Sequence, residues 1–252
     1  MDKSPVSTSQ QSPRQNRLLA ALPVKVYDRL QPYLEFVPLD LGWALYESGQ
    51  QQQYVYFPTT SIVSKLCVTE DARSTEIAIV GNCGMVGIAV FMGDGSAPRR
   101  AVVQGAGNCY RLGARMLKSE FDKGGDLQRL LLHYTHALIT QILLTSACNR
   151  HHTVEQQQYR WLLLSLDRLP SNELIMTEEL IANLLGVCLE DVTEAAGKLQ
   201  TAGLIHYSRG KITVLNRPKL EAEVCECYAV VKREYDGLLT YFAATQGNQQ
   251  VR

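Results

Sequence analysis

Thiol and imidazole side chains at helical spacing are the first candidates for chemistry in this 252-residue sequence. Cys148 and His152 lie four residues apart, so on a helix they project from one face, where both can bind a metal ion. His133 and His136 form a second pair, three residues apart. A single pair of this kind is more often part of the packing or the surface than a ligand set. We therefore predict neither a metal nor a heme site.

The remaining cysteines do not complete a ligand set. Cys225 and Cys227 are separated by one residue, and on a helix such side chains point in different directions. We expect one core thiol and one near-surface thiol there. All seven cysteines are scattered along the chain, which fits a reducing compartment better than a disulfide framework. Redox sensing through Cys148, Cys225 or Cys227 is the alternative, and it requires a thiol of depressed pKa.

Composition and motifs exclude several classes of function. Apolar residues make up 46% of the chain and charged residues 20%, which is typical of a soluble globular protein. No apolar run can cross a bilayer, and the polar segment 1–16, predicted to be a disordered tail, lacks the apolar core of a signal peptide. We expect a cytoplasmic protein without a membrane partner. No Gly-x-Ser-x-Gly elbow, phosphate-binding loop or His-Glu-x-x-His motif occurs, so we predict no enzyme activity and no catalytic residue.

Small and apolar residues at fixed spacing in residues 177–215 predict a helix-turn-helix followed by a two-stranded wing. Ala182 allows a second helix to cross the first closely, and Gly186 falls at the tight turn between them, where a positive φ favours glycine. Such a module reads DNA with its second helix in the major groove. An ordinary helical hairpin with a β-ribbon is the alternative. The second helix is indicated by Val192, Ala195, Ala196 and Leu199, and the wing by residues 204–208 and 211–215.

Charge is the main argument against this interpretation. The whole chain has 25 Lys and Arg against 25 Asp and Glu, and residues 153–252 have 10 against 13. DNA-binding domains usually carry excess positive charge, because phosphate contacts supply much of the affinity. The predicted reading helix presents Glu190, Asp191 and Glu194 against Lys198 alone. A module that acts mainly through protein–protein contacts is therefore the alternative.

Short apolar segments separated by turn residues predict an antiparallel sandwich or barrel within residues 17–125. One or two short helices, punctuated by Pro23 and Pro32, precede it. The expected strands cover residues 41–46, 54–57, 61–68, 75–80, 101–103 and 108–112.

Residues 126–152 lack Gly and Pro and predict one long helix. Residues from Leu131 to His152 alternate by three and four in a mostly apolar stripe, which is the spacing of a coiled-coil seam. We predict that this seam pairs with a second copy of the chain; a helix buried wholly in its own domain is the alternative. Residues 153–252 then form the C-terminal domain, with a first helix at 154–166 and residues 169–174 as a loop. The predicted seam residues are Leu131, Tyr134, Leu138, Gln141, Thr145 and Cys148.

The order of these parts resembles the Crp/Fnr family of bacterial transcription regulators over roughly residues 17–235. The strongest local matches are residues 45–49 (LYESG), 55–58 (VYFP), 84–87 (GMVG) and 177–199. The resemblance implies an α+β fold: an N-terminal antiparallel β jelly-roll barrel of the cyclic-nucleotide-binding type, a long dimerisation helix and a C-terminal winged helix-turn-helix domain. It also implies a homodimer that binds double-stranded DNA in response to a small-molecule or redox signal and that contacts RNA polymerase.

The resemblance also implies effector-binding residues. Family members that bind cyclic nucleotides hold the phosphate with a glycine-rich loop and an arginine, which here match Gly84 and Gly87, and Arg99 or Arg100. Ile88 stands where a glutamate would hold the ribose hydroxyl, and isoleucine accepts no hydrogen bond. We therefore expect no cyclic AMP or cyclic GMP as cofactor. The alternative is that the glycines only let the chain turn.

The family's base-contacting positions fall on Leu189, Glu190 and Glu194, where arginine, glutamate and arginine are common. Only Glu190 matches, and neither of the other two side chains can make a bidentate contact with guanine. Hydroxyl and basic groups nearby are expected at phosphates. The residues predicted at the DNA are Thr177, Cys188, Leu189, Glu190, Thr193, Glu194, Lys198, Tyr207, Arg209 and Lys211.

Overall fold

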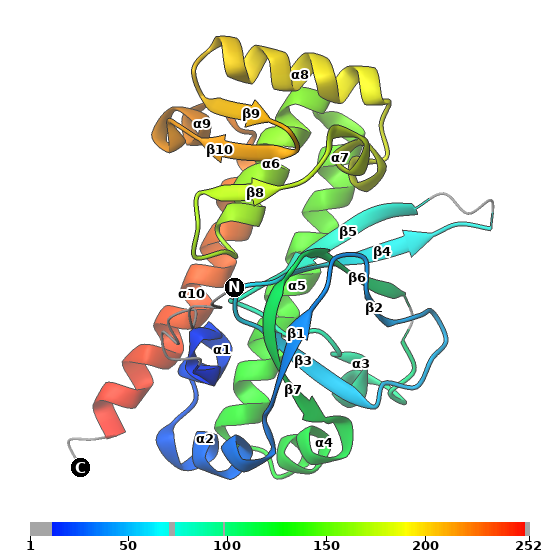
Figure 1. Ribbon diagram of the computed structural model, residues 1–252. Coiled ribbons are helices and arrows are strands. Elements are labelled where there is room, and N and C mark those ends of the chain that lie inside the picture. Colours follow the sequence, from blue (N-terminus) through cyan, green and yellow to red (C-terminus); the bar gives the residue numbers. More distant parts are fainter. Residues whose placement is uncertain (1–11, 71–73, 98, 250–252) are drawn as a thin grey trace, which may run out of the picture.

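The computed structural model describes residues 12–70, 74–97 and 99–249. A β-barrel lies beside a long helix, α5, and a second domain with a helix-turn-helix lies beyond the far end of that helix (Figure 1). The predicted α+β fold is confirmed.

The N-terminal segment predicted as a tail covers residues 1–16, of which residues 1–11 lie outside the described part of the chain. Its last part is ordered: Pro13–Gln15 forms a short 3-10 helix (η1), and the buried Asn16 amide donates to two backbone carbonyls.

Two antiparallel sheets build the barrel. One has the order β1-β7-β3 and the other β2-β6-β4-β5. Their inner faces bury apolar side chains such as Val55, Val63 and Leu112 between them. The strands are β1 Glu35–Leu39, β2 Ala44–Tyr46, β3 Tyr54–Pro58, β4 Ile62–Val68, β5 Ser74–Val80, β6 Arg100–Gly105 and β7 Gly107–Gly113. The short helices around them are α1 Arg17–Ala20, α2 Val24–Leu30, η2 Gln31–Tyr33, α3 Ala89–Met92 and α4 Ala114–Asp122.

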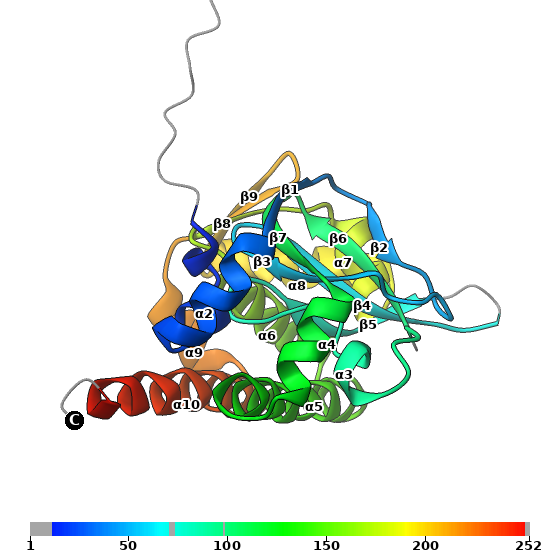
Figure 2. The same cartoon turned by 90° about the horizontal axis from the view of Figure 1, so that it is seen from below.

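Two long helices, α5 (Asp126–His151) and α10 (Glu226–Gln249), form a layer against the barrel. Seen from below, they lie side by side along one edge of the molecule, with the barrel on one side of the layer (Figure 2). The predicted long helix is therefore present, and a helix from the C-terminal end of the chain packs along it. None of the helices that the structure describes is long and apolar enough to span a bilayer.

The residues predicted as a dimer seam are all buried within their own chain, so this assignment is wrong. Tyr134 donates from its hydroxyl to the carbonyl of Met85 in the barrel (2.7 Å), and Gln141 donates to the carbonyl of Ile79 (3.3 Å). Cys148 faces the start of α10. The spacing of three and four marks the face that the barrel and α10 cover. The residues wrongly assigned to the dimer seam are Leu131, Tyr134, Leu138, Gln141, Thr145 and Cys148, each at most 6% exposed.

The C-terminal domain contains a three-stranded wing sheet rather than the predicted two-stranded wing. Residues 173–175, expected within or beside a loop, form strand β8, which pairs with β10. The strand is three residues long and buries only Leu174, too little for a periodic pattern to reveal. The elements are α6 Val154–Leu166, β8 Glu173–Ile175, α7 Glu178–Leu185, α8 Leu189–Thr201, β9 Ile205–Ser208, β10 Lys211–Val214 and α9 Arg217–Glu223.

Candidate nucleic-acid interface and sensor cavities

Helices α7 and α8 form the predicted helix-turn-helix. Thr177 caps α7 by accepting a hydrogen bond from the amide of Leu180 (3.3 Å). Gly186 ends α7 in the left-handed conformation, at φ 72°, as a tight turn between the helices requires. Thr177 therefore has a structural role in addition to its predicted place at the DNA.

Helix α8 has one buried face and one exposed face. Val192, Ala195, Ala196 and Leu199 are at most 3% exposed and pack within the domain. The opposite face carries the predicted base-contacting residues Leu189, Glu190 and Glu194, all of which are exposed. Figure 1 shows α8 on the outside of the molecule, at the end farthest from α4. The predicted reading face of α8 is therefore exposed to solvent.

The acidic side chains at the start of α8 have a structural explanation. The N-cap residue, Cys188, makes no side-chain hydrogen bond to the first turn, so the amide groups there lack a capping acceptor. Glu190 and Asp191 lie in that turn, where negative charge interacts favourably with the helix dipole. The same carboxylates occupy the end of the helix that would otherwise attract a phosphate.

Two of the predicted basic contacts are held in ion pairs within the chain. Lys198 lies 3.0 Å from Glu194 and 3.4 Å from Glu155, and the hydrogen bond with Glu194 raises the pKa of the lysine. Lys211 lies 2.8 Å from Glu173 on the neighbouring strand β8. A phosphate group would therefore have to compete with these carboxylates for both ammonium groups.

Hydroxyl groups predicted at the DNA also have partners in the chain. Thr193 donates to Glu178 (2.5 Å), which ties α8 to the first turn of α7. The Tyr207 hydroxyl donates to the carbonyl of Met176 (3.3 Å) and is partly buried. Arg209, by contrast, is exposed at the tip of the wing, where it and Gly210 have φ values of 51° and 74°. Two positive φ values are typical of a tight type I′ hairpin, which projects Arg209 away from the domain.

The four residues predicted at an effector are not brought together in a cavity. A Cβ on Gly84 would lie 2.8 Å from the Tyr134 hydroxyl, and Gly87 adopts a φ of +118° against Val55. Both glycines are therefore required by packing. Arg100 pairs with Glu47 at 3.0 Å and lies in a cleft between the barrel and α7. Arg99, its exposed neighbour, lines none of the cavities described below.

The barrel instead contains a cavity of about 250 Å³ beneath α3, which the sequence did not indicate. Lys65 and Gln52 line it, together with Tyr46 and Ile88. Burial lowers the pKa of Lys65 to about 8, and the buried Oε1 atom of Gln52 has no hydrogen-bond partner among the described residues. Lys65 belongs to β4, whose first five residues are all buried.

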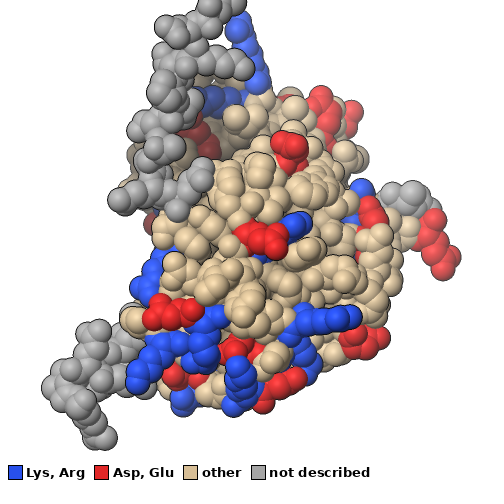
Figure 3. Space-filling view, turned by 60° about the horizontal axis from the view of Figure 1, so that its bottom comes forward, with Lys and Arg blue, Asp and Glu red and all other residues tan. Residues whose placement is uncertain are grey.

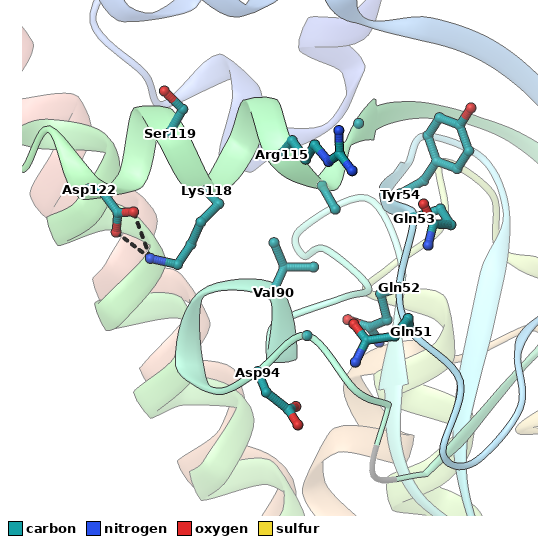
Figure 4. Close-up of a pocket in the computed structure, with 13 residues that line it drawn as sticks. Gln51, Gln52, Gln53, Tyr54, Val90, Asp94, Arg115, Lys118, Ser119 and Asp122 are labelled. Carbon is teal, nitrogen blue, oxygen red and sulfur yellow. Dashed lines mark hydrogen bonds and ion pairs between the residues drawn. The ribbon is translucent and has the colours of Figure 1, made fainter.

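A larger groove of about 1040 Å³ adjoins this cavity through Gln52. It lies between α3, one face of α4 and the chain before β3 (Figure 4). Its walls carry amides and charges, and the Lys118 ammonium is held by Asp122 at 2.5 Å. Gln51, Gln53 and Arg115 complete its polar side. The sensor domain therefore has a polar outer groove and a small inner cavity that contains a buried cation.

Comparison with known proteins agrees with this architecture. A family model of the Crp-like helix-turn-helix domain matches residues 159–223. FixK2 from Bradyrhizobium japonicum has a TM-score of 0.63 at 18% identity, covering 76% of this chain and 98% of that chain. A CRP/FNR-family transcriptional regulator from Thermus thermophilus has a TM-score of 0.57 at 19% identity, covering 77% and 98%. The c-di-GMP responsive global regulator CLP from Xanthomonas campestris has a TM-score of 0.58 at 14% identity, covering 76% and 99%. No curated protein sequence matches this chain significantly.

Residues 159–223 thus form a Crp-like helix-turn-helix domain. The chain as a whole has the fold of the Crp/Fnr-type DNA-binding transcription regulators, and the resemblance inferred from the sequence is confirmed.

Proposed function

We propose that this protein is a homodimeric transcription regulator that binds a palindromic DNA site through α8 and couples a signal in the barrel to that binding. The observation that carries the proposal is the exposed face of α8, mounted on a Crp-like helix-turn-helix domain. Two-fold symmetry would place two reading helices about one helical turn, roughly 34 Å, apart on the duplex.

The dimer contact is proposed on the exposed face of α5, not on the seam predicted from the sequence. Leu132, Ile139 and Leu143 are 44%, 46% and 64% exposed. With His136 between the first two, their spacing is four, three and four residues, as in a coiled-coil seam. On the face of the molecule seen in Figure 3, basic and acidic side chains are interleaved along the lower edge.

The signal is proposed to bind in the cavity beneath α3. Lys65 offers a buried ammonium, and the side-chain oxygen of Gln52, which accepts no hydrogen bond from the described residues, offers an acceptor. A volume of about 250 Å³ is below the roughly 300–1,000 Å³ of sites for drug-sized ligands, which favours a small anion over a cyclic nucleotide. Ile88 lines the same cavity, so an apolar side chain takes the place of the family's ribose-binding carboxylate.

The test is selection of DNA from a random pool by the purified full-length protein, followed by titration of the selected duplex at several salt concentrations. We expect an enriched palindrome and a binding constant that falls as salt rises, because phosphate contacts release counterions. The acidic α8 and the paired lysines predict weak binding to bulk DNA. Absence of any enriched sequence, together with absence of salt-dependent binding at low salt, would contradict the proposal and favour a protein partner.

A further inference from the structure

The junction between α5 and α10 brings three thiols and one imidazole together. Cys148 lies in the last turn of α5 and His152 is its C-cap residue, whereas Cys225 precedes α10 and Cys227 lies in its first turn. The ligand atoms of all four lie within 4.8 Å of one another. The prediction that Cys225 and Cys227 point in different directions is wrong, because Cys225 is not helical and turns toward the same point as Cys227.

The distances within this cluster fit ligands around a single ion. The Cys148 and Cys225 sulfurs are 3.7 Å apart, and the Cys227 sulfur is 3.7 Å from Nδ1 of His152. A zinc–sulfur bond of about 2.3 Å in tetrahedral geometry places two ligand sulfurs about 3.8 Å apart. A disulfide would require about 2.05 Å. An iron–sulfur cluster contains several metal atoms and would spread its ligands further apart than one ion does.

Groups outside the four ligands are placed as in known metal sites. The other imidazole nitrogen of His152, Nε2, lies 3.5 Å from the carboxylate of Glu226, an arrangement that orients metal-binding histidines. With Glu226 accepting from Nε2–H, the lone pair of Nδ1 faces the thiols. The Gln157 side-chain amide donates to the backbone carbonyl of His152 (3.0 Å) and holds the backbone of this residue in place.

A buried guanidinium balances the charge that such a site would carry. Arg160 is 3% exposed, and its Nε donates to the Cys148 sulfur (3.2 Å) while Nη1 donates to Thr145 (3.0 Å). Three thiolates, one neutral imidazole and one divalent cation have a net charge of −1, which the guanidinium neutralises. The buried carboxyl of Glu76 also interacts electrostatically with Arg160, and three neutral thiols would add no negative charge beside the guanidinium.

The cluster is also shielded from water. Cys148, Cys225 and Cys227 form an apolar group separate from the main core, against which Leu144 and Val224 pack. Low solvent access strengthens the interaction between a cation and thiolates. A closed set of four protein ligands, with no position left open, is characteristic of structural rather than catalytic zinc sites.

We propose that Cys148, His152, Cys225 and Cys227 bind one zinc-class divalent cation, which fastens the start of α10 to the end of α5. The chain enters the helix-turn-helix domain directly after His152 and leaves it directly before Cys225. One ion therefore joins the entry and the exit of that domain to the long helix of the sensor. The proposal is independent of the DNA site and of the signal.

The test is the metal content of the full-length protein, expressed with added zinc and purified under reducing conditions without a histidine tag. We expect one zinc per chain by elemental mass spectrometry. Replacement of the zinc by Co²⁺ in the wild-type protein should give intense visible bands of tetrahedral coordination and a thiolate-to-cobalt charge-transfer band. Retention of less than about a tenth of an ion per chain after desalting, or a metal-free Cys148–Cys225 disulfide as the product, would overturn the proposal.

Matched variants assign the ligands. Cys148→Ser, Cys225→Ser and Cys227→Ser should each lower zinc affinity at least tenfold in competition with a chelator, whereas Cys188→Ser, at an exposed thiol, should retain wild-type zinc. Glu226→Gln keeps all four ligands, and loss of its hydrogen-bonding carboxylate should weaken binding by roughly tenfold. Equal loss of zinc in Cys188→Ser would contradict the assignment. The cobalt spectrum of the wild type tests the site even if a ligand variant fails to fold.

Discussion

The buried guanidinium of Arg168 donates a hydrogen bond from Nε to the backbone carbonyl of Ile79 (3.1 Å), so the C-terminal domain is anchored on a strand of the barrel. The contact is reciprocal, because the amide of Asn82 donates to the carbonyl of Arg168 (3.2 Å). Gln141 of α5 accepts from Nη2 of the same guanidinium (2.9 Å). Gly81 permits this approach: a Cβ there would lie 2.6 Å from the Cβ of Arg168 and 2.7 Å from its carbonyl oxygen. Gly81, Asn82 and Arg168 thus form a close backbone contact between the two domains.

Gly81→Ala should therefore separate the domains locally. The added methyl group meets the backbone and Cβ of Arg168, which cannot rotate away, so we expect a loss of stability of about 1–3 kcal/mol. Thermal unfolding measures the loss, and limited proteolysis after Arg168 should become faster. Gly113→Ala is the matched control, because a Cβ there would meet nothing within 4 Å. Equal melting temperatures for Gly81→Ala and the wild type would contradict the importance of this contact.

Local signals predicted most of the fold correctly. The long helix was expected at residues 126–152 and is observed at Asp126–His151, and the helix expected at 154–166 is observed with the same bounds. Positive φ at Gly186 followed from the need for a tight turn. Periodicity does not specify which element packs against an apolar helix face. The stripe through Tyr134 and Gln141 was correctly identified as buried, but α10 comes from about 90 residues further along the chain and takes the place expected for a second copy.

The candidate sites were predictable to different degrees. Exposed positions on α8 follow from helical spacing, so Leu189 and Glu194 lie where the sequence placed them. The cavity around Lys65 depends on the crossing of strands from several parts of the barrel, and no local pattern reports it. The thiol cluster combines a helical pair, Cys148 and His152, with Cys225 and Cys227 at a helix start. Spacing within each pair gives no information about the distance between the pairs.

Stability should depend on pH through Glu76. This carboxyl is fully buried beside the Ser64 hydroxyl, and burial raises its pKa from 4.5 to about 7. Because the folded state binds the proton more tightly than the unfolded state, this group's contribution to stability is most favourable below about pH 4.5. The contribution is lost as pH rises through 7, a change of about 3 kcal/mol. Denaturant titrations of the wild type and Glu76→Gln across pH 5–8 should show this slope in the wild type and its absence in the variant. Glu223→Gln, at an exposed position, serves as the control; parallel pH profiles for wild type and Glu76→Gln would refute the assignment.

Leu143→Glu should convert the protein to a monomer if the exposed face of α5 is the dimer contact. Leu143 is 64% exposed in the isolated chain, so the charge costs little there but would be buried in the proposed seam. We expect the dissociation constant, measured by sedimentation velocity, to rise at least about a hundredfold, which corresponds to roughly 2.7 kcal/mol. Leu41→Glu places the same charge at a 59% exposed leucine between β1 and β2 and should leave the mass unchanged. A Leu143→Glu variant that remains dimeric would move the interface elsewhere.

Within the helix-turn-helix domain, we expect the wing to contact DNA phosphates and α8 to determine the preferred bases. Arg209→Ala removes an exposed guanidinium at the tip of the wing, where a phosphate contact is expected, so binding should weaken to a similar extent for all duplexes. The slope of the binding constant against salt concentration should fall by about one. Glu190→Ala removes a carboxylate on the exposed face of α8, so it should change the preferred base at one position of each half-site by roughly 1–3 kcal/mol.

Both variants are measured on the selected duplex and on duplexes with single substitutions, at two or more salt concentrations. Lys219→Ala, at an exposed lysine on α9, controls for the general loss of a positive charge. Lys211→Ala should have a smaller effect than Arg209→Ala, because Glu173 already pairs with the Lys211 ammonium at 2.8 Å. If Arg209→Ala and Glu190→Ala change affinity and preference in the same way, the wing and the helix do not have the separate roles assigned to them.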